Sequence, residues 1–183
     1  MNTYHVPVLF YESIDGLEIK PDGIYVDCTF GGGGHSQGIL DKLASDGKLV
    51  AFDQDVDAQQ NLPKDDRLVF IPQNFRHLQR FLRLHGIEKI DGLLADLGVS
   101  SFQFDEGERG FSTRFEGPLD MRMDRRQQKT AAMVIKEYGE LQLHKMFEQY
   151  GEVTNAKTLA RNIVTQRSIM PAATIRDFKA MVH

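Results

Sequence analysis

The chain has 183 residues, of which 41% are hydrophobic and 26% charged, as is typical of a soluble globular protein with one well-packed core. Its single cysteine, Cys28, excludes an internal disulfide framework and favours a reducing compartment. No apolar stretch approaches the roughly 18 residues of a membrane span, and the N-terminus lacks the features of a signal peptide, so we expect a cytoplasmic protein without membrane contact.

The net charge of −4 is unevenly distributed along the chain. Residues 1–108 carry 9 basic and 18 acidic residues, a balance of −9, whereas residues 109–183 carry 13 and 8, a balance of +5. Such asymmetry indicates either an acidic domain joined to a segment that faces a polyanion, or an acidic surface followed by salt-bridged helices. Composition leaves both interpretations open.

Short apolar runs and helical patterns alternate over the first hundred residues. The runs predict strands over 24–28, 48–53, 67–71 and within 89–99. The fourth run is almost continuously apolar, which predicts a strand covered on both faces. The alternation predicts a parallel sheet with right-handed crossovers, in which the fourth strand lies next to the first.

A helical pattern follows each of the first three strands. GHSQGILDKLA places Ile39, Leu40 and Leu43 on one face. DVDAQQNL has Asp55 as its N-cap, and FRHLQRFLRLHG ends at Gly86. These patterns predict helices that cover the sheet.

The pattern changes after Asp96. Residues 97–128 form a long Gly- and Arg-rich connection without a clear period, and loops of this length are usually functional. Four helical patterns then follow: TAAMVIKEY, GELQLHKMFEQYG, TNAKTLARNIVTQRS and TIRDFKAMV. We therefore predict an α/β half over residues 1–108 and a loop with a helical domain over residues 109–183.

The stretch DCTFGGGGHSQG places four consecutive glycines, residues 31–34, between the first strand and its helix. Ligands of open parallel sheets bind at the carboxyl ends of the strands, and a helix N-terminus offers N–H groups to an anion. Asp53 ends the second strand twenty residues after Gly33, where an acidic residue commonly binds ribose hydroxyls. Gly31, Gly33, Gly34 and Asp53 therefore predict a site for a nucleoside-containing cofactor.

Two carboxylates at strand ends bear on which cofactor binds. The glycine spacing does not fit the G-x-G-x-x-G pattern of dinucleotide sites. Asp27 would repel a pyrophosphate but suits S-adenosylmethionine, which carries a sulfonium and an ammonium group. We predict S-adenosylmethionine, with a nicotinamide-dependent oxidoreductase as the alternative. Asp96 would face the reactive end of the cofactor, or else be a turn or N-cap residue.

Several segments resemble, in order and spacing, the bacterial family that methylates a cytosine N4 in small-subunit ribosomal RNA (MraW). They are HVPVL (5–9), DCTFGGGGHS (27–36), DLGVSS (96–101) with Gln103, ERGFS (108–112) and GPLDMRMD (117–124). The pair of GPLDMRMD with DLGVSS is the most specific part, and the match runs from about His5 to the end of the chain. The resemblance implies a Rossmann-like S-adenosylmethionine-dependent methyltransferase with a helical domain inserted after the fourth strand.

The resemblance also implies individual cofactor contacts. It carries such roles onto Gly33, Gly34 and His35 in the loop, Asp53 on the ribose, Phe75 beside the adenine, and Asp96 and Gln103 near the methionine end. The residue pattern by itself does not single out His35, Phe75 or Gln103. A lone Phe is more often a core residue, and a His at a helix start more often makes local hydrogen bonds.

The chain departs from the family pattern in two places. Phe102 stands where many relatives have proline. The family also continues with further strands and a Ser-Phe-His-Ser segment, whereas this chain stops at His183. We expect a truncated chain with an open edge on its fourth strand, a tendency to self-associate and incomplete activity. A non-catalytic fragment that binds RNA and cofactor is the alternative.

Methyl transfer to cytosine N4 needs an acceptor for the amine hydrogens, because the nitrogen lone pair is delocalised into the ring. Asp96 and the hydroxyls of Ser100 and Ser101 are the candidates. The base must leave its stack, and Phe102 and Phe104 could hold it or instead anchor the loop in the core. DNA amino-methyltransferases are a further alternative, but they usually carry an Asp-Pro-Pro-Tyr-like segment in place of DLGVSS.

Six cations lie between residues 109 and 129 and predict an RNA partner, either small-subunit ribosomal RNA or the ribosomal subunit. We predict that Arg122 pairs with Asp120 or Asp124. We predict RNA contact for Arg109, Arg125, Arg126 and Lys129. The scattered histidines and the single cysteine predict no metal centre.

Overall fold

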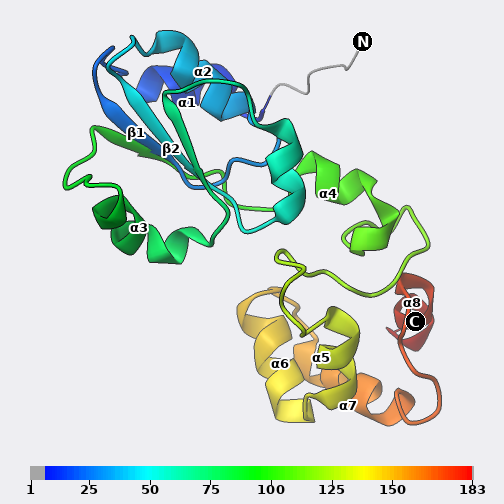
Figure 1. The fold of residues 1–183 in the computed structure, drawn as a ribbon. Helices are drawn as coiled ribbons and strands as arrows, with labels where there is room; N and C mark the ends of the chain where they lie inside the picture. Colours follow the sequence, from blue (N-terminus) through cyan, green and yellow to red (C-terminus); the bar gives the residue numbers. More distant parts are fainter. Residues whose placement is uncertain (1–6, 183) are drawn as a thin grey trace. The chain divides into compact units, whose positions relative to one another are not determined.

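A computed structural model describes residues 7–182 of the chain (Figure 1). It divides into two compact units, Met1–Ser100 and Ser101–His183, whereas the sequence placed the boundary after residue 108. The first unit holds a parallel sheet with flanking helices, and the second is built from helices and irregular chain. This confirms the predicted fold class of a Rossmann-like parallel sheet followed by a helical region.

The sheet of the first unit has four parallel strands in the order β3-β2-β1-β4. Asp27, the last residue of β1, lies opposite Ala51 of β2 and Leu94 of β4. The prediction that the fourth strand pairs with the first is therefore confirmed. The strands are β1 (Ile24–Asp27), β2 (Lys48–Phe52), β3 (Leu68–Ile71) and β4 (Gly92–Leu94).

Helices cover both faces of this sheet because its side chains alternate in direction. Tyr25 and Leu49 pack with α1 (Phe10–Gly16) and α2 (Gly34–Lys42), and Val50 packs on the other face with α3 (Leu78–Leu84). The segment after β2 is the 3₁₀ helix η1 (Val56–Asn61), and the predicted N-cap Asp55 is confirmed, since its side chain accepts from the N–H of Asp57. A second 3₁₀ helix, η2 (Phe75–His77), precedes α3.

The helix α1 was not predicted from the sequence. It has only seven residues, and its N-cap, Leu9, has a left-handed backbone and no capping side chain, so the usual start signals are absent. It closes one face of the sheet by packing against Gly38. A Cβ at Gly38 would lie 2.7 Å from the Phe10 ring and 3.0 Å from Ile14, so the helices meet at this glycine.

The strand β4 differs from the prediction of a strand covered on both faces. It has three residues, lies at the edge of the sheet, and leaves the Leu93 side chain 45% exposed. Only Leu94 of this strand is buried. The prediction of two covered faces is therefore wrong: the apolar run forms an edge strand, and the face that carries Leu93 is not covered.

The helical unit confirms the four predicted helices. Leu143, Ala160 and Ile163, from α6 and α7, are fully buried in its core. The connection over residues 97–128, for which the sequence shows no clear period, contains α4 and η3. Among residues 7–182, no helix is long and apolar enough to cross a membrane. The elements are α4 (Ser101–Asp105), η3 (Gly107–Arg109), α5 (Ala131–Glu137), α6 (Glu140–Gln149), α7 (Ala156–Gln166) and α8 (Ile175–Val182).

The irregular segment that contains GPLDMRMD is tied into the helical unit through its backbone. Gly117 accepts from the N–H of Ile175, and the N–H of Leu119 donates to Ala173. A Cβ at Gly117 would lie 2.1 Å from the carbonyl oxygen of Gly107, so only glycine allows the two segments to approach this closely. This segment is therefore a fixed part of the unit.

Candidate functional site

The glycine loop after β1 and the carboxylate after β2 lie in direct contact. The Oδ2 atom of Asp53 accepts a hydrogen bond from the N–H of Gly31 at 2.7 Å, and its Oδ1 atom accepts from the N–H of Asp55 at 2.8 Å. The structure thus brings together two residues that the sequence predicted to share a site. Both oxygens of the Asp53 carboxylate already accept backbone N–H groups. A bound ribose would therefore share these oxygens with the backbone.

Asp27 is fully buried at the end of β1. Its Oδ1 atom accepts from the N–H of Thr29 at 2.9 Å, and its Oδ2 atom accepts from the hydroxyl of Ser36 at 2.7 Å. Burial raises the pKa of Asp27, and the hydrogen bonds from Ser36 and Thr29 partly oppose this shift. The sequence-based interpretation of Asp27 as a carboxylate that faces a cationic ligand is therefore corrected. Its side chain is buried and is bound to Thr29 and Ser36 at the two ends of the glycine loop.

Asp96 lies two residues beyond β4 and is exposed. Its backbone N–H donates to the Oγ1 atom of Thr29 at 2.8 Å. Because the N–H of Thr29 is itself bound by Asp27, the ends of β1 and β4 are linked through one threonine. This linkage fixes the backbone from which the Asp96 carboxylate projects.

The glycines of the loop have different physical roles. Gly33 has a φ of 79°, and a Cβ there would lie 2.9 Å from the Phe30 ring; one at Gly34 would lie 2.5 Å from Pro7. The fold therefore requires glycine at both positions. At Gly32, φ lies outside the left-handed region and an added Cβ would meet no atom within 4 Å. Sequence reasoning missed Gly32 as a separate residue, because a run of four glycines does not show which member faces open space.

His35 follows the loop in the first turn of α2. Its side chain is 6% exposed and its ring stacks on Phe10 with 5.9 Å between centroids. The Nε2 atom is buried and has no hydrogen-bond partner among the residues that the structure describes. Buried polar atoms without partners are rare in folded proteins, and the packing of the described residues gives no reason for this one.

The remaining predicted site residues lie in both units. Phe75 begins η2 after β3, and its side chain is 37% exposed. Ser100 is half-buried and ends the first unit. Ser101 and Gln103 belong to α4 of the second unit, where Ser101 is exposed and Gln103 is buried. Phe102 and Phe104 are both exposed on α4, which contradicts their role as core anchors and leaves base stacking as a prediction.

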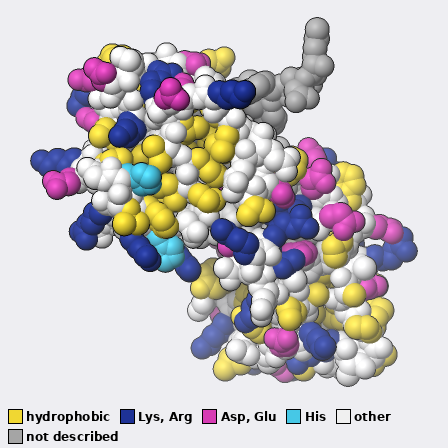
Figure 2. Space-filling view, viewed as in Figure 1, with side chains coloured by type: hydrophobic (Ala, Val, Ile, Leu, Met, Phe, Trp, Pro, Cys, Tyr) yellow, Lys and Arg dark blue, Asp and Glu magenta, His cyan; other side chains and the backbone are white. Residues whose placement is uncertain are grey.

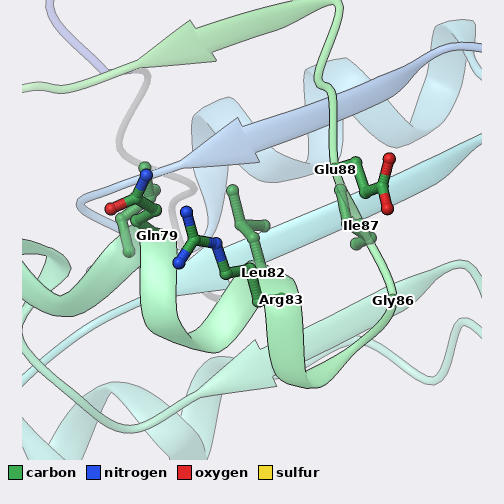
Figure 3. A pocket seen from close by; sticks show the side chains of 7 residues that line it. Gln79, Leu82, Arg83, Gly86, Ile87 and Glu88 are labelled. Carbon is green, nitrogen blue, oxygen red and sulfur yellow. The ribbon is translucent and has the colours of Figure 1, made fainter.

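A surface hollow of about 560 Å³ lies beside α3 (Figure 3). Leu82 and Ile87 contribute apolar surface, and Gln79, Arg83 and Glu88 contribute polar groups. None of the predicted site residues lines it. The hollow is therefore separate from the glycine loop and does not enter the argument on the cofactor.

Arg109 and Arg122 are structural residues of the helical unit. Arg109 is 3% exposed and its Nη2 atom donates to the carbonyl of Arg122, so the predicted RNA contact of Arg109 is wrong. Arg122 binds both carboxylate oxygens of Asp120, at 2.8 and 2.7 Å, which confirms the predicted pairing and lowers the pKa of Asp120.

The other predicted RNA contacts differ among themselves. Arg126 pairs with Asp124 at 2.8 and 3.2 Å, an ion pair that the sequence did not predict. Arg125 is exposed, and Lys129 is exposed with its ammonium 5.1 Å from the centre of the Tyr138 ring. Basic and acidic side chains are interspersed on the face of the helical unit in Figure 2. The basic excess of this half therefore does not form a patch of one sign on that face.

Comparison with known proteins identifies similar chains. The model of the MraW methylase family matches residues 2–183. The chain is 58% identical over 171 residues to the ribosomal RNA small subunit methyltransferase H of Christiangramia forsetii, covering 93% of this chain and 57% of the relative. It is 55% and 54% identical to the proteins of the same name from Flavobacterium johnsoniae and Phocaeicola vulgatus, covering 98% of this chain and 59% of each relative. The chain thus spans less than two thirds of these relatives.

The buried carboxylate of Asp27 predicts a specific pH dependence of stability. Its pKa is higher in the folded than in the unfolded chain, so its contribution is most favourable below the unfolded pKa and is lost as the pH rises through the folded pKa. Asn in its place keeps the shape without the charge: its oxygen can accept from the N–H of Thr29, and its amide N–H can donate to the Ser36 hydroxyl, which reverses that hydrogen bond. We expect Asp27→Asn to flatten the decrease in unfolding free energy above about pH 4, measured by urea titration at a series of pH values. Parallel curves for the two proteins would contradict this assignment.

Proposed function

The chain belongs to the MraW methylase family, and from this premise we propose that it is part of an S-adenosylmethionine-dependent methyltransferase for small-subunit ribosomal RNA. The substrate atom would be the N4 amine of a cytosine, as the family resemblance implies. The observation that carries the proposal is the glycine loop held against Asp53, with an open side at Gly32. Methylation of ribosomal RNA, as part of its processing, is consistent with a cytoplasmic location.

The residues of the loop fit S-adenosylmethionine. The N-terminus of α2 suits the polar methionine end, as does the Nε2 atom of His35, which has no hydrogen-bond partner among the described residues. Asp53 suits the ribose hydroxyls, and Phe75 the adenine ring. The family resemblance assigns Asp96 and Gln103 to the methionine end. When bound, the cofactor supplies a methyl group activated by the positive charge on its sulfur.

The chain's own contribution to the chemistry is to orient the amine and to receive its proton. The Asp96 carboxylate is a hydrogen-bond acceptor when ionised, and Thr29 holds its backbone in place. Ser100 and Ser101 offer hydroxyl oxygens as alternative acceptors. Binding an N4 hydrogen would localise the nitrogen lone pair, and much of the rate would come from positioning.

A methyl group at Gly32 is expected to block the cofactor without changing the fold. Asp53→Ala would be a less specific test, because Asp53 also holds the N–H of Gly31. We expect Gly32→Ala to keep the wild-type melting temperature and to weaken S-adenosylmethionine binding about tenfold or more, measured by calorimetric titration. Gly16→Ala is the matched control, since an added Cβ there also meets no atom within 4 Å. Equal affinity in both variants, or binding of NAD by the wild type instead, would contradict the cofactor site.

Replacement of Asp96 by asparagine tests the proposed proton acceptor. The amide keeps the side-chain shape but accepts a proton far less readily than the carboxylate. We expect Asp96→Asn to lower the rate of methyl transfer about 100-fold or more, with S-adenosylmethionine affinity within about twofold of the wild type. Transfer of labelled methyl groups to small ribosomal subunits that lack the modification measures the rate. A variant with the wild-type rate would exclude Asp96 from this role.

Arg125 and Lys129 are the exposed cations that we assign to phosphate contact. We expect Arg125→Ala and Lys129→Ala each to weaken binding to small-subunit ribosomal RNA and to reduce the slope of log affinity against log salt by about 1. Lys145→Ala, on the exposed side of α6, is the control and should leave the slope unchanged. If all three variants retain the wild-type slope, the RNA assignment of this loop is wrong.

A further inference from the structure

Met121 adopts a backbone conformation that is unfavourable for its side chain. Its φ is 57°, in the left-handed region, where a Cβ approaches the following carbonyl oxygen. Among residues 7–182, nine residues have a positive φ. Five are glycines, which adopt it without this steric cost. Met121 is one of the four that carry a side chain. A glycine would satisfy the backbone here, so the presence of Met calls for a different explanation.

The surrounding contacts hold Met121 in this conformation from both sides. Its N–H donates to the carbonyl of Arg109 at 3.0 Å. The flanking residues Asp120 and Arg122 are joined by two side-chain hydrogen bonds, and the carbonyl of Asp120 accepts from the N–H of Ala131. The geometry at residue 121 is thus imposed by its neighbours and is stored as local strain.

The strain at Met121 is not offset by burial of its side chain in the hydrophobic core. It is 47% exposed, whereas Leu119, two residues earlier, is buried in the core of the helical unit. Strained residues of this kind are concentrated at functional sites. An exposed thioether on a rigid loop is an adaptable apolar contact surface.

The charges in the loop of Met121 bear on the kind of surface that this side chain suits. The acidic residues Asp120 and Asp124 are paired with Arg122 and Arg126. Arg125 and Lys129 are exposed on the same stretch of chain. Arg122 also donates to the carbonyls of Arg125 and Gln127, which fixes the course of the loop between the apolar residue and the cations. An apolar tip beside positive charges matches a polyanion that also offers apolar faces, namely RNA with an unstacked base.

We propose that Met121 is an apolar wedge that packs against an unstacked base of the RNA substrate while Arg125 and Lys129 contact its phosphates. The proposal rests on the RNA substrate proposed above and adds the residue that contacts a base. Because an apolar contact releases no counterions, it changes affinity without changing the salt dependence of binding. This separates its effect from that of the neighbouring cations.

Substitution of Met121 by glycine is expected to change stability and RNA binding in opposite directions. Met121→Gly removes the strain and the side chain together. We expect its melting temperature to be unchanged or a few degrees higher, and its affinity for refolded small-subunit ribosomal RNA to fall about tenfold at an unchanged salt slope. Met121→Leu keeps an apolar side chain and should retain most of the affinity.

Glu152→Gly is the matched control, because Glu152 also has a positive φ of 51° and lies exposed in the same unit. It should be as stable as the wild type or more so, with full RNA affinity. Heparin, a polyanion without bases, serves as the second probe, and Met121→Gly should bind it as the wild type does. A Met121→Gly variant with wild-type RNA affinity, or with an equal loss for heparin, overturns the wedge. A wild-type chain that does not bind the RNA overturns the proposed substrate, and the wedge with it.

Discussion

The geometry of the candidate site depends on one fully buried carboxylate, that of Asp27. A buried carboxyl group is tolerated only when its hydrogen-bonding capacity is used, and here the N–H of Thr29 and the hydroxyl of Ser36 use it. Ser36 lies in the first turn of α2, and Thr29 binds the backbone N–H of Asp96. A single buried side chain therefore sets the positions of the glycine loop, the start of the helix and the chain that follows β4. A second carboxylate, Asp53, holds the same loop from the neighbouring strand.

This arrangement separates the residues that build the loop from those left to meet a ligand. The side chains around Gly33 and Gly34 leave no room for a Cβ, so these glycines are required by packing. Gly32 and the Nε2 atom of His35 have no comparable reason in the fold, since one faces open space and the other lacks a partner among the described residues. A bound ligand, as proposed above, would account for both. The features that support the proposed site are thus the ones that packing leaves unexplained.

Local patterns predict the sheet well, because strand periodicity, turn glycines and the rule that ligands meet the carboxyl ends of parallel strands are short-range or topological signals. The same signals correctly place the glycine loop beside Asp53. They fail where the outcome depends on tertiary partners. The burial of Arg109 and the pairing of Arg126 depend on a loop without periodicity, and the exposure of Leu93 depends on which strand forms the edge. The helix α1 is too short, and its start too unusual, for a sequence signal.

The segment GPLDMRMD is the most family-specific part of the sequence, yet most of its residues serve the architecture of the helical unit. A chain that is neither helix nor strand must satisfy its backbone groups by other means. Here Arg122 binds the carbonyls of Arg125 and Gln127, and Asp120 binds Arg122. Each of these contacts uses the long, multidentate side chain of Arg122, so the packing of the loop depends on this residue. Met121 is not needed for any of these side-chain contacts. The motif therefore forms a rigid loop. Met121 is the residue of this loop that has both a strained backbone and an exposed side chain, so we look to Met121 for the function of the motif.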